Sequence, residues 1–574
     1  MKRSVERLSK RTIMLTNAHQ DCYMADVTHE PTVSFATTPY AWTHWLLELD
    51  GARATLKMNI QEDGGLRPGY ELKLNSYDMG VDIELYDVLQ HLRFEHPEVS
   101  VVTVTSAIDR VFCSGANIYM LASSSHPFKV NFCKFTNETR CSMEEPESPH
   151  FIAALNGACA GGGYELAMAC DDIYLVDDGS SAVSLPEVPL LGVLPGTGGL
   201  TRLTDKRRVR RDLADVFCTK AEGFRAKPAK KGRFIDDAFP RSKWEASMDR
   251  VSLAAVEKVG APQDKGISWT PLAPTQTETG FAWEHLSLDL DEKQRTATLT
   301  LKGPQSAPPS SAAEFQEMGA SAWCIAAFRE LEQAIFELRF NHATVGMILI
   351  KTQGDSEKVL AWDAFVADNQ DHWLARQTVS FQRRTLQRMD NMSRSMFALI
   401  EEGHCFAGVL FELTVSADRS YMFMDDDGEN QIHLGPANGN GDKGGPFPMA
   451  NGLTRLENRF YGEPESVAKA LKASPVEAED AEDLGLVTLS LDDIDYEDEV
   501  RIAIEERVSL SPDALTGMEQ NLRFTGAEGM DNRIFGRLTA WQNWIFQRPN
   551  AVGESGALTL YGQPERPDFD FRRT

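Results

Sequence analysis

The feature that most constrains the fold of this chain is an internal repeat at an offset of 246 residues. The matching segments are 84–96 with 330–342, 101–105 with 347–351, and, after one added residue, Glu165-Leu166 with Glu412-Leu413 and Tyr174 with Tyr421. Agreement that extends over about ninety residues at one offset indicates a duplicated structural unit rather than chance identity. The sequence therefore predicts two copies of one unit in tandem.

Hydrophobic periodicity predicts that each copy is an α/β unit. Residues 82–94 carry apolar side chains at helical spacing, whereas Val99–Thr105 is rich in β-branched residues and 51–60 alternates as a strand does. Strand, helix and strand continue to alternate after these segments, which favours an α/β fold with crossover connections.

Prolines interrupt the periodicity between the two copies, at Pro262, Pro271 and Pro274. Such residues mark loops and connections. We therefore expect an N-terminal extension over 1–40, a first α/β domain over 41–265, a second over 266–500 and a helical C-terminal region over 501–574.

Charge and cysteine content limit the partners and the compartment. The formal net charge of −27 excludes nucleic acid and anionic membranes as expected partners, because phosphate binding needs surplus Lys and Arg. Nine cysteines without a C-x-x-C pair predict free thiols and a cytoplasmic protein. The longest apolar stretch, 151–170, contains four glycines and Glu165, so we expect a buried core segment rather than a membrane span. The histidines form no zinc spacing, and no metal is expected.

Two glutamates in apolar surroundings are the strongest candidates for chemistry. Glu165 follows the glycine run 161–163, and Glu187 follows Leu185-Pro186. A desolvated carboxylate is costly unless it is paired or used. Two carboxylates close together also tend to divide their pKa values, so that one donates a proton while the other accepts one.

Two turns of small residues could supply backbone N–H groups to a negatively charged oxygen. One is Ser114-Gly115-Ala116-Asn117, and the other is the glycine run 161–163 at the start of a predicted helix. Without side chains in the way, N–H groups can face a ligand, and a helix N-terminus favours negative charge. The sequence predicts acid/base chemistry beside such an oxyanion site.

Four motifs together resemble the crotonase (enoyl-CoA hydratase/isomerase) superfamily over roughly residues 45–574. They are the segments 112–118, 156–166, 186–188 and 194–202, in that order. The resemblance implies two spiral ββα units with a helical C-terminal region. It also implies an acyl-CoA substrate, with water as co-substrate, and no cofactor.

The resemblance assigns roles to individual residues. Glu165 and Glu187 become the acid/base pair, and the N–H groups of Ala116 and Gly162 become the oxyanion donors. Ser114, Gly115, Asn117 and Gly161 become substrate-binding residues, and Cys133, on an insertion at 122–150, is a further catalytic candidate. The chain departs from simple hydratases at Asn117, where they carry aspartate, and at Ser76-Tyr77, near which they carry Arg-Pro.

Segments 130–140 and 533–544, with the duplicated layout, are most similar to the ring-cleaving branch of this superfamily. That branch opens the 2,3-epoxide or 2,3-dihydrodiol of benzoyl-CoA in aerobic benzoate degradation, and releases formate and 3,4-dehydroadipyl-CoA semialdehyde. Two alternatives remain: a hydratase or isomerase for another enoyl-CoA, and a non-catalytic acyl-CoA-binding scaffold.

The second copy is expected to be degenerate. Trp362 stands opposite Ala116, the glycine run becomes Ala407-Gly408-Val409, and the position opposite Glu187 falls near His433-Leu434. We expect this copy to serve as scaffold. Because two fused copies carry internal pseudo-symmetry, a homodimer is the expected assembly.

Overall fold

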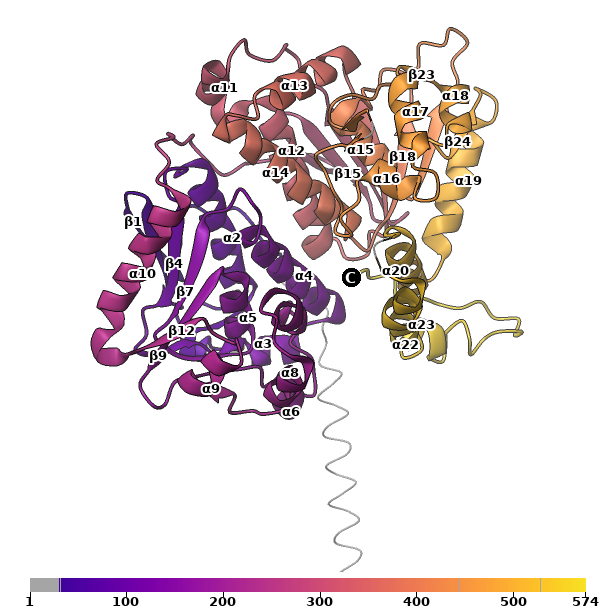
Figure 1. Cartoon of the computed structure of the whole chain (residues 1–574). Helices are drawn as coiled ribbons and strands as arrows, with labels where there is room; N and C mark the ends of the chain where they lie inside the picture. The colour runs from indigo at the N-terminus through magenta and orange to yellow at the C-terminus, as the bar shows by residue number, and fades with distance from the viewer. Residues whose placement is uncertain (1–29, 31, 442, 527) are drawn as a thin grey trace, which may run out of the picture.

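The computed structural model describes residues 30, 32–441, 443–526 and 528–574 (Figure 1). Most of the expected N-terminal extension, and Cys22 with it, lies outside the described residues. The described part contains two large sheets and a group of C-terminal helices.

The first large sheet has six strands in the order β1-β2-β4-β7-β9-β12. The β1–β2 pair is antiparallel and the remaining pairs are parallel. The strands are β1 (Trp45–Asp50), β2 (Arg53–Met58), β4 (Val101–Ser106), β7 (His150–Leu155), β9 (Asp172–Asp177) and β12 (Asp237–Pro240). Parallel strands need crossover connections and helical cover on both faces. One face packs on α10 (Trp244–Val259), and the other packs on α2 (Met79–Phe94), α4 (His126–Met143) and α5 (Gly162–Ala169).

The predicted helix over 82–94 is α2, which begins three residues earlier than expected. The carboxylate of Asp78 caps it by accepting hydrogen bonds from the N–H groups of Gly80 and Val81. An aspartate at this position satisfies N–H groups that have no acceptor inside the helix. The cap therefore fixes the start of α2 directly after the short strand β3 (Ser76–Tyr77).

A second, smaller layer of strands carries the motifs of the predicted site. It has the order β11-β10-β8-β5, with the pair β3-β6 beside it. Its members are β5 (Arg110–Cys113), β6 (Gly115–Ala116), β8 (Gly157–Ala160), β10 (Ala182–Ser184) and β11 (Phe224–Arg225). β7 and β8 are separated by Asn156 alone, so one extended segment passes from the large sheet into this layer. β8 then leads into α5, which places the start of that helix at the layer.

The second large sheet repeats the strand order of the first. Its order is β13-β14-β15-β16-β17-β18-β19-β24, in which β15–β16 is antiparallel and the following pairs are parallel. The strands are β13 (Thr275–Gln276), β14 (Gly280–Ala282), β15 (Leu286–Asp291), β16 (Thr296–Lys302), β17 (Met347–Gln353), β18 (Ser395–Ile400), β19 (Arg419–Phe423) and β24 (Leu489–Leu491). Helices α12 (Trp323–Asn341), α14 (Trp373–Asp390) and α15 (Gly408–Ser416) pack on one face, and α19 (Tyr496–Ser509) packs on the other.

We call the two parts built around these sheets the first unit (β1 to α10) and the second unit (β13 to α19). The other helices of the first unit are α3 (Ile118–Ser123), α6 (Glu187–Leu191), α7 (Gly199–Thr201), α8 (Arg211–Cys218) and α9 (Ala226–Lys231). Those of the second unit are α11 (Ala312–Met318), α13 (Ser356–Asp368), α16 (Arg455–Arg459), α17 (Glu465–Ala473) and α18 (Ala478–Asp483), with the short strands β20 (Gln431–Ile432), β21 (Gly439–Asn440), β22 (Lys443–Gly444) and β23 (Val476–Glu477).

The predicted insertion at 122–150 forms α4, which joins the two units. Glu138 on this helix pairs with Arg339 at 2.8 Å and with Arg388, both in the second unit. Glu145, just beyond α4, pairs with Arg384 at 2.6 Å. These carboxylates are largely buried, and a buried ion pair requires well-placed partners on both sides. The contacts therefore fix α4 between the catalytic candidate Glu165 and the second unit.

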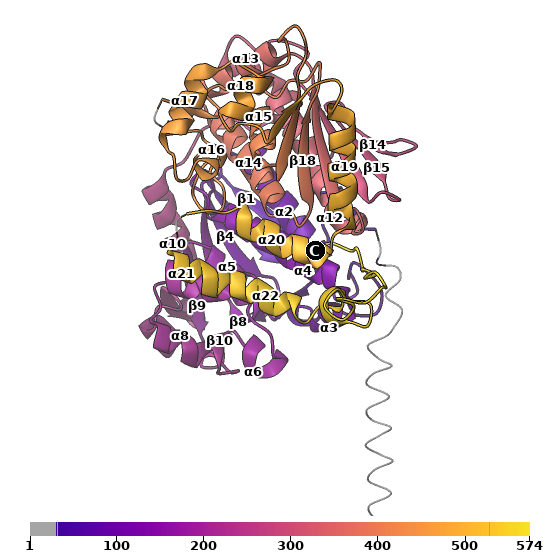
Figure 2. The same ribbon diagram turned by 90° about the vertical axis from the view of Figure 1, so that its right-hand side faces the viewer.

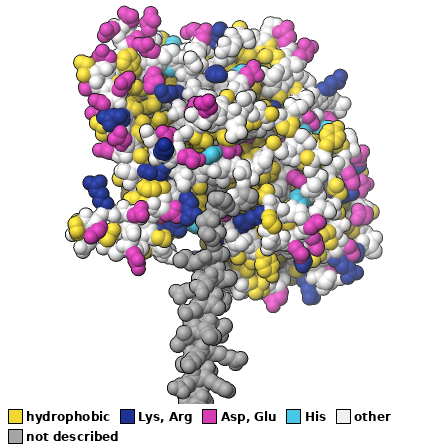
Figure 3. All heavy atoms as spheres, turned by 180° about the vertical axis from the view of Figure 1, so that it is seen from behind, with side chains coloured by type: hydrophobic (Ala, Val, Ile, Leu, Met, Phe, Trp, Pro, Cys, Tyr) yellow, Lys and Arg dark blue, Asp and Glu magenta, His cyan; other side chains and the backbone are white. Residues whose placement is uncertain are grey.

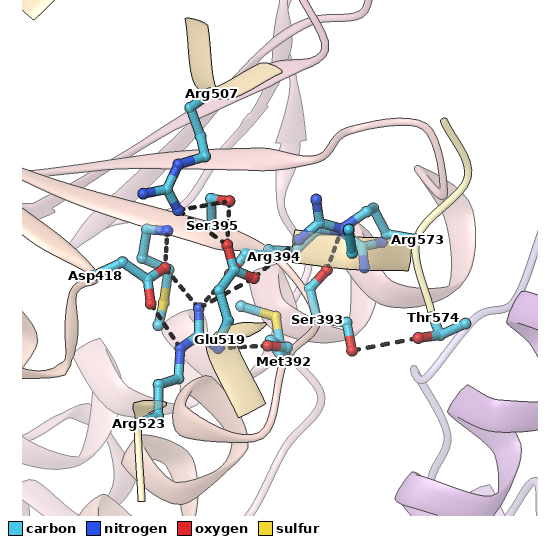
Figure 4. A network of polar contacts seen from close by, with 12 residues as sticks. Met392, Ser393, Arg394, Ser395, Asp418, Arg507, Glu519, Arg523, Arg573 and Thr574 are labelled. Atoms are coloured by element: carbon cyan, nitrogen blue, oxygen red, sulfur yellow. Dashed lines mark hydrogen bonds and ion pairs between the residues drawn. The ribbon is translucent and has the colours of Figure 1, made fainter. Parts of the chain in front are cut away.

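The C-terminal helices pack on the second unit through a buried charge network (Figure 4). Its centre is Glu519 on α20 (Pro512–Leu522), which pairs with Arg507 at 3.2 Å and with Arg573 at 3.0 Å. Arg523 pairs with Asp418 at 2.7 Å. The remaining helices are α21 (Met530–Asn532), the π-helix η5 (Arg533–Leu538), α22 (Thr539–Ile545) and α23 (Pro549–Val552). Figure 2 shows these helices crossing in front of the first unit, where Trp544 stacks on His126 of α4 with ring centroids 5.7 Å apart.

The described surface carries charges of both signs. On the face seen in Figure 3, Lys and Arg side chains are interspersed with Asp and Glu. Within the described ranges, no helix combines the length and the apolar character that crossing a bilayer requires.

Candidate active site

The start of α5 is the point where the motifs of the first unit meet. Gly161 precedes the helix with a φ of 54°, a conformation that favours glycine, and its N–H donates to the carbonyl of Ser184 at 3.0 Å. A Cβ atom on Gly163 would lie 2.5 Å from the Cβ of Cys113. The glycine run is therefore required for the close packing of α5 on β5.

Gly115, the residue before the predicted donor Ala116, packs against the other predicted donor, Gly162. A Cβ atom on Gly115 would lie 2.9 Å from the nitrogen of Gly162. In the β3–β6 pair, the N–H of Asn117 donates to the carbonyl of Tyr77. Because N–H groups alternate in direction along a strand, the preceding N–H, that of Ala116, points away from β3. The N–H of Gly162 belongs to the first turn of α5 and has no acceptor within that helix.

Glu165 lies one turn into α5 and accepts three hydrogen bonds. The N–H groups of Thr197 and Gly199 donate to Oε1 at 2.9 and 2.8 Å, and the hydroxyl of Thr197 donates to Oε2. The side chain is buried. Three donors around two carboxylate oxygens are the complement of an ionised carboxylate, which only accepts.

The loop that holds Glu165 is the segment 195–199, whose glycines resemble those of a phosphate-binding loop. Arg202 donates to the carbonyl of Thr197 at 3.1 Å and pairs with Glu144 at 2.8 Å. A Cβ atom on Gly198 would lie 2.0 Å from the Arg202 guanidinium, and the φ of Gly198 is 91°. The glycines thus let a buried arginine hold the loop against α5.

Glu187, the first residue of α6, has a different environment. A Cβ atom on Gly161 would lie 2.9 Å from its Oε1, so the carboxyl group lies beside the residue that precedes α5. Its Oε2 is buried and has no hydrogen-bond partner among the described residues. Burial raises the pKa of Glu187 to about 7; its own N–H lowers it in part, and the charge of Glu165 raises it further. Near neutral pH the Glu187 carboxyl is therefore partly protonated.

Cys133 lies on α4 and is half-buried against the first hydrophobic core. Burial, with the charge of Glu165 as the next cause, raises the pKa of its thiol to about 11. The side chain is thus a neutral thiol at pH 7, because only a lowered pKa produces a thiolate there. Its catalytic role stays a prediction.

The remaining predicted residues have mainly structural contacts. Gly115 has a φ of 95°, and the exposed Ser114 donates its hydroxyl to the carbonyl of Lys73 at 3.3 Å. The amide of Asn117 caps α3: its oxygen accepts from the N–H of Met120 at 2.9 Å, and its nitrogen donates to the carbonyl of Glu71 at 2.7 Å. Substrate contacts by these residues stay predictions.

Several site residues carry no clear signal in the sequence. They are Thr197 and Gly199, which hold Glu165, and the cluster of Tyr77, Arg140 and Asp82 beside the glycine run. The glycine-rich run 195–199 is a sequence signal for Thr197 and Gly199, although such a pattern is more typical of a phosphate-binding loop. For Tyr77 the one available signal is its departure from the superfamily pattern.

The second unit repeats the backbone of the site with one shift in register. Ala407 bridges His433 as Ala160 pairs with Ser184, and the N–H of Gly408 donates to the carbonyl of His433 at 2.9 Å. The glycine run 161–163 therefore corresponds to Gly408-Val409-Leu410, one residue later than expected. Counting on from His433, Pro436 stands opposite Glu187, rather than a residue near His433-Leu434.

In the second unit the N–H that corresponds to that of Gly162 is already occupied. The N–H of Val409 donates to Oδ2 of Asp363 at 2.7 Å. Asp363 and its neighbour Trp362 lie on α13, a helix in the place of the strand that carries Ala116. Glu412, opposite Glu165, pairs with Arg455 at 3.1 Å. The side chains of the second unit thus satisfy one another.

No group of three or more His, Cys, Asp or Glu side chains in the described ranges is placed to hold a metal ion. The groups gathered around α5 are instead backbone N–H groups, two carboxyls and a thiol. This set can donate hydrogen bonds to an anionic oxygen and can transfer protons.

Comparison with known proteins identifies the family to which the chain belongs. Residues 71–258 match the family described as enoyl-CoA hydratase/isomerase. Over 547 residues the chain is 53% identical to the benzoyl-CoA-dihydrodiol lyase of Aromatoleum evansii, and the alignment covers 94% of this chain and 98% of that protein. The chain belongs to the benzoyl-CoA-dihydrodiol lyase family of the crotonase superfamily. The resemblance seen in the sequence is thereby confirmed.

Other crotonase relatives match a smaller part of the chain. The fatty acid oxidation complex subunit alpha of Shewanella loihica is 31% identical over 232 residues, which are 40% of this chain and 31% of that protein. The crystal structure of an enoyl-CoA hydratase from Bacillus anthracis is 24% identical, with a TM-score of 0.32, and covers 37% of this chain and 77% of that one.

The raised pKa of Glu187 predicts an observable titration. The carboxyl should be protonated at pH 6 and ionised at pH 8.5. Difference infrared spectra between these two pH values should contain a carboxylic acid band that disappears in Glu187→Gln. A band of unchanged intensity in the variant would assign the titration to another group.

The raised pKa of Asp363 should make the stability of the second unit depend on pH. Burial raises its pKa to about 8, while the Val409 N–H lowers it and the charge of Glu412 raises it. Because the folded state then binds the proton more tightly than the unfolded state, this group lowers stability as the pH rises from about 4 to about 8. Asp363→Asn cannot titrate, so its melting temperature relative to the parent should rise between pH 5 and pH 8.5. A constant difference would contradict the assignment.

Proposed function

We propose that this chain is a ring-opening carbon–carbon lyase that acts on the 2,3-epoxide or 2,3-dihydrodiol of benzoyl-CoA. The products are formate and 3,4-dehydroadipyl-CoA semialdehyde, an intermediate of aerobic benzoate degradation. The observation that carries the proposal is 53% identity to a benzoyl-CoA-dihydrodiol lyase across 98% of that protein. The epoxide consumes two water molecules and the dihydrodiol one. Because the conversion adds only water, the proposal includes no metal or redox cofactor.

The N–H groups of Ala116 and Gly162 bind the thioester oxygen in this proposal. When a bond of the ring breaks, electrons move into the thioester carbonyl and its oxygen becomes negative. The close approach of Gly115 to Gly162 supports this role, since it brings both donors to one point. Removal of one such donor costs on the order of 3 kcal/mol in other enzymes.

The two glutamates divide proton transfer between them. Glu165, surrounded by donors, is the carboxylate that takes a proton from the attacking water. Glu187, whose pKa is about 7, starts protonated and gives its proton to the departing oxygen. A general acid works best when its pKa lies near the operating pH. The charge of Glu165 helps to raise the pKa of the Cys133 thiol, and this neutral S–H group can act as a further hydrogen-bond donor.

The proposal limits catalysis to the first unit and makes the second unit a degenerate tandem copy. Two observations support this division. The strand order of the first sheet recurs in the second, and the oxyanion position of the second unit is occupied by Asp363. We also retain the expected division of the chain into four parts, with boundaries at about residues 40 and 265. The third boundary moves from 500 to about 510, because α19 packs on the second sheet as far as Ser509.

We further propose a cytoplasmic homodimer. The eight described cysteines are free, as expected in a reducing compartment. Internal pseudo-symmetry within one chain makes a two-fold assembly the simplest closed one. Light scattering during size exclusion should give twice the 63.8 kDa of one chain. A trimeric or hexameric mass would contradict this.

Formate release tests the proposed reaction. Incubation with the 2,3-epoxide of benzoyl-CoA should give formate and the C6 semialdehyde in equal amounts. Turnover of crotonyl-CoA without formate would instead identify an enoyl-CoA hydratase. Tight acyl-CoA binding without turnover of either substrate would identify a scaffold.

Variants of the two glutamates locate the chemistry within the first unit. Glu165→Gln and Glu187→Gln should each lower formate production by 10²-fold or more, because a positioned acid or base contributes about 10²–10⁴-fold. Glu412→Gln and Asp363→Asn in the second unit are matched controls that should retain turnover. Full activity in either first-unit variant would refute the acid/base assignment.

A further inference from the structure

Tyr77 lies in the backbone that forms the predicted oxyanion site. It is in register with Ala116 in the β3–β6 pair, and its carbonyl accepts the N–H of Asn117. The side chain is buried, with the ring of Phe132 6.1 Å away and the Arg140 guanidinium 5.2 Å from its ring centre. The ring therefore has a fixed place between β3 and α4.

The Tyr77 hydroxyl is buried and has no hydrogen-bond partner among the described residues. Tyr164, which is as deeply buried, donates to the carbonyl of Phe234 at 2.7 Å. The Tyr496 hydroxyl, far along the chain in α19, also has no partner among the described residues, so the place of the Tyr77 hydroxyl beside Gly162 is what carries the argument. An unsatisfied buried polar group costs about 1–3 kcal/mol, so native structures rarely retain one without a use.

The position of the unsatisfied hydroxyl indicates that use. A Cβ atom on Gly162 would lie 2.0 Å from the Tyr77 oxygen, so the hydroxyl occupies the space beside the residue whose N–H we assign to the thioester oxygen. Gly162 has no side chain to block that space. The corresponding space beside the preceding residue, Gly161, is filled by the carboxyl of Glu187.

We propose that Tyr77 is a further catalytic residue, whose hydroxyl donates a third hydrogen bond to the thioester oxygen beside the N–H groups of Ala116 and Gly162. The proposal rests on the acyl-CoA chemistry proposed above. The hydroxyl keeps its proton throughout, so no covalent bond forms or breaks at Tyr77. Its contribution is greatest when the oxygen carries negative charge, because a charged acceptor strengthens the bond.

The surroundings of Tyr77 keep its hydroxyl protonated, so that the hydroxyl can donate a hydrogen bond. Burial raises its pKa well above the usual value, and the cation of Arg140 opposes only part of that rise. Arg140 is in turn fixed by Asp82 at 3.3 Å and by the carbonyl of Thr136 at 3.2 Å. Arg140 is therefore a positioning residue that holds the Tyr77 ring from the α4 side.

The carbonyl stretch of bound benzoyl-CoA, labelled with ¹³C at the thioester carbon, tests the proposal without turnover. Hydrogen bonds to this oxygen lower the stretching frequency in difference infrared spectra. We expect a smaller downshift in Tyr77→Phe than in the parent protein. The matched control is Tyr164→Phe, which removes a buried hydroxyl bonded elsewhere and should retain the full downshift.

Turnover and stability of the same variants complete the test. Formate production should fall by about 10²–10³-fold in Tyr77→Phe, the effect of losing one oxyanion donor. Without ligand, Tyr77→Phe should melt at the parent's temperature or above, because it removes an unsatisfied hydroxyl. Tyr164→Phe should melt lower, because it loses a hydrogen bond.

The outcomes separate this inference from the proposed reaction. An unchanged carbonyl shift and unchanged turnover in Tyr77→Phe would overturn it, as would the absence of any shift in the parent protein. A parent protein that shows the shift but releases no formate would refute the ring-opening reaction alone. The reduced shift in Tyr77→Phe would then still assign the donor.

Discussion

The whole site depends on a close backbone approach that only glycine permits. Gly115 lies against the nitrogen of Gly162, and Gly163 lies against Cys113, at separations that leave no room for a Cβ atom. This contact brings β6 to the start of α5, so N–H groups from two distant segments reach one place. Glu187 and the hydroxyl of Tyr77 lie beside the same glycine run. A side chain at any of these glycines would separate the two elements.

The two glutamates show how one small region gives two carboxyl groups different surroundings. They lie close to the same helix start, but one receives three hydrogen bonds and the other leaves a buried oxygen without any. Burial alone favours the neutral acid, whereas donors favour the anion. The difference arises from the loop 195–199, which reaches Glu165 and not Glu187.

Much of this architecture could be predicted from the sequence, because the relevant signals are local. The periodicity of 82–94 gave the helix α2, although the Asp78 cap moved its start to Met79. The glycine runs located both loops of the site. The expected alignment of 407–409 with the glycine run was one residue off, because the bridge between Ala407 and His433 is a tertiary contact.

The remaining features depend on contacts that have no local signature. The insertion at 122–150 gave no hint that it would be a long helix paired with Arg388 of the other unit. The run 195–199 resembles a phosphate loop in its glycines but lacks the Lys-Ser/Thr of a P-loop, and its glycines alone did not indicate that it would bind Glu165. Tyr77 could not be singled out, because a buried hydroxyl is unusual only when its neighbours are known.

If the second unit is a degenerate copy, as proposed, Asp363 shows how it could lose its activity and keep its fold. A carboxyl group attached to the same chain competes with any free ligand at an effective concentration that a dissolved molecule does not reach. Once Asp363 accepts the hydrogen bond from the Val409 N–H, further substitutions in this part of the second unit carry no functional cost. One of them is Pro436, which stands at the position of Glu187. Under the proposed tandem origin, the aspartate acts as a permanent internal inhibitor. The second unit could then change into a scaffold that contacts α4, the helix beside the proposed active site.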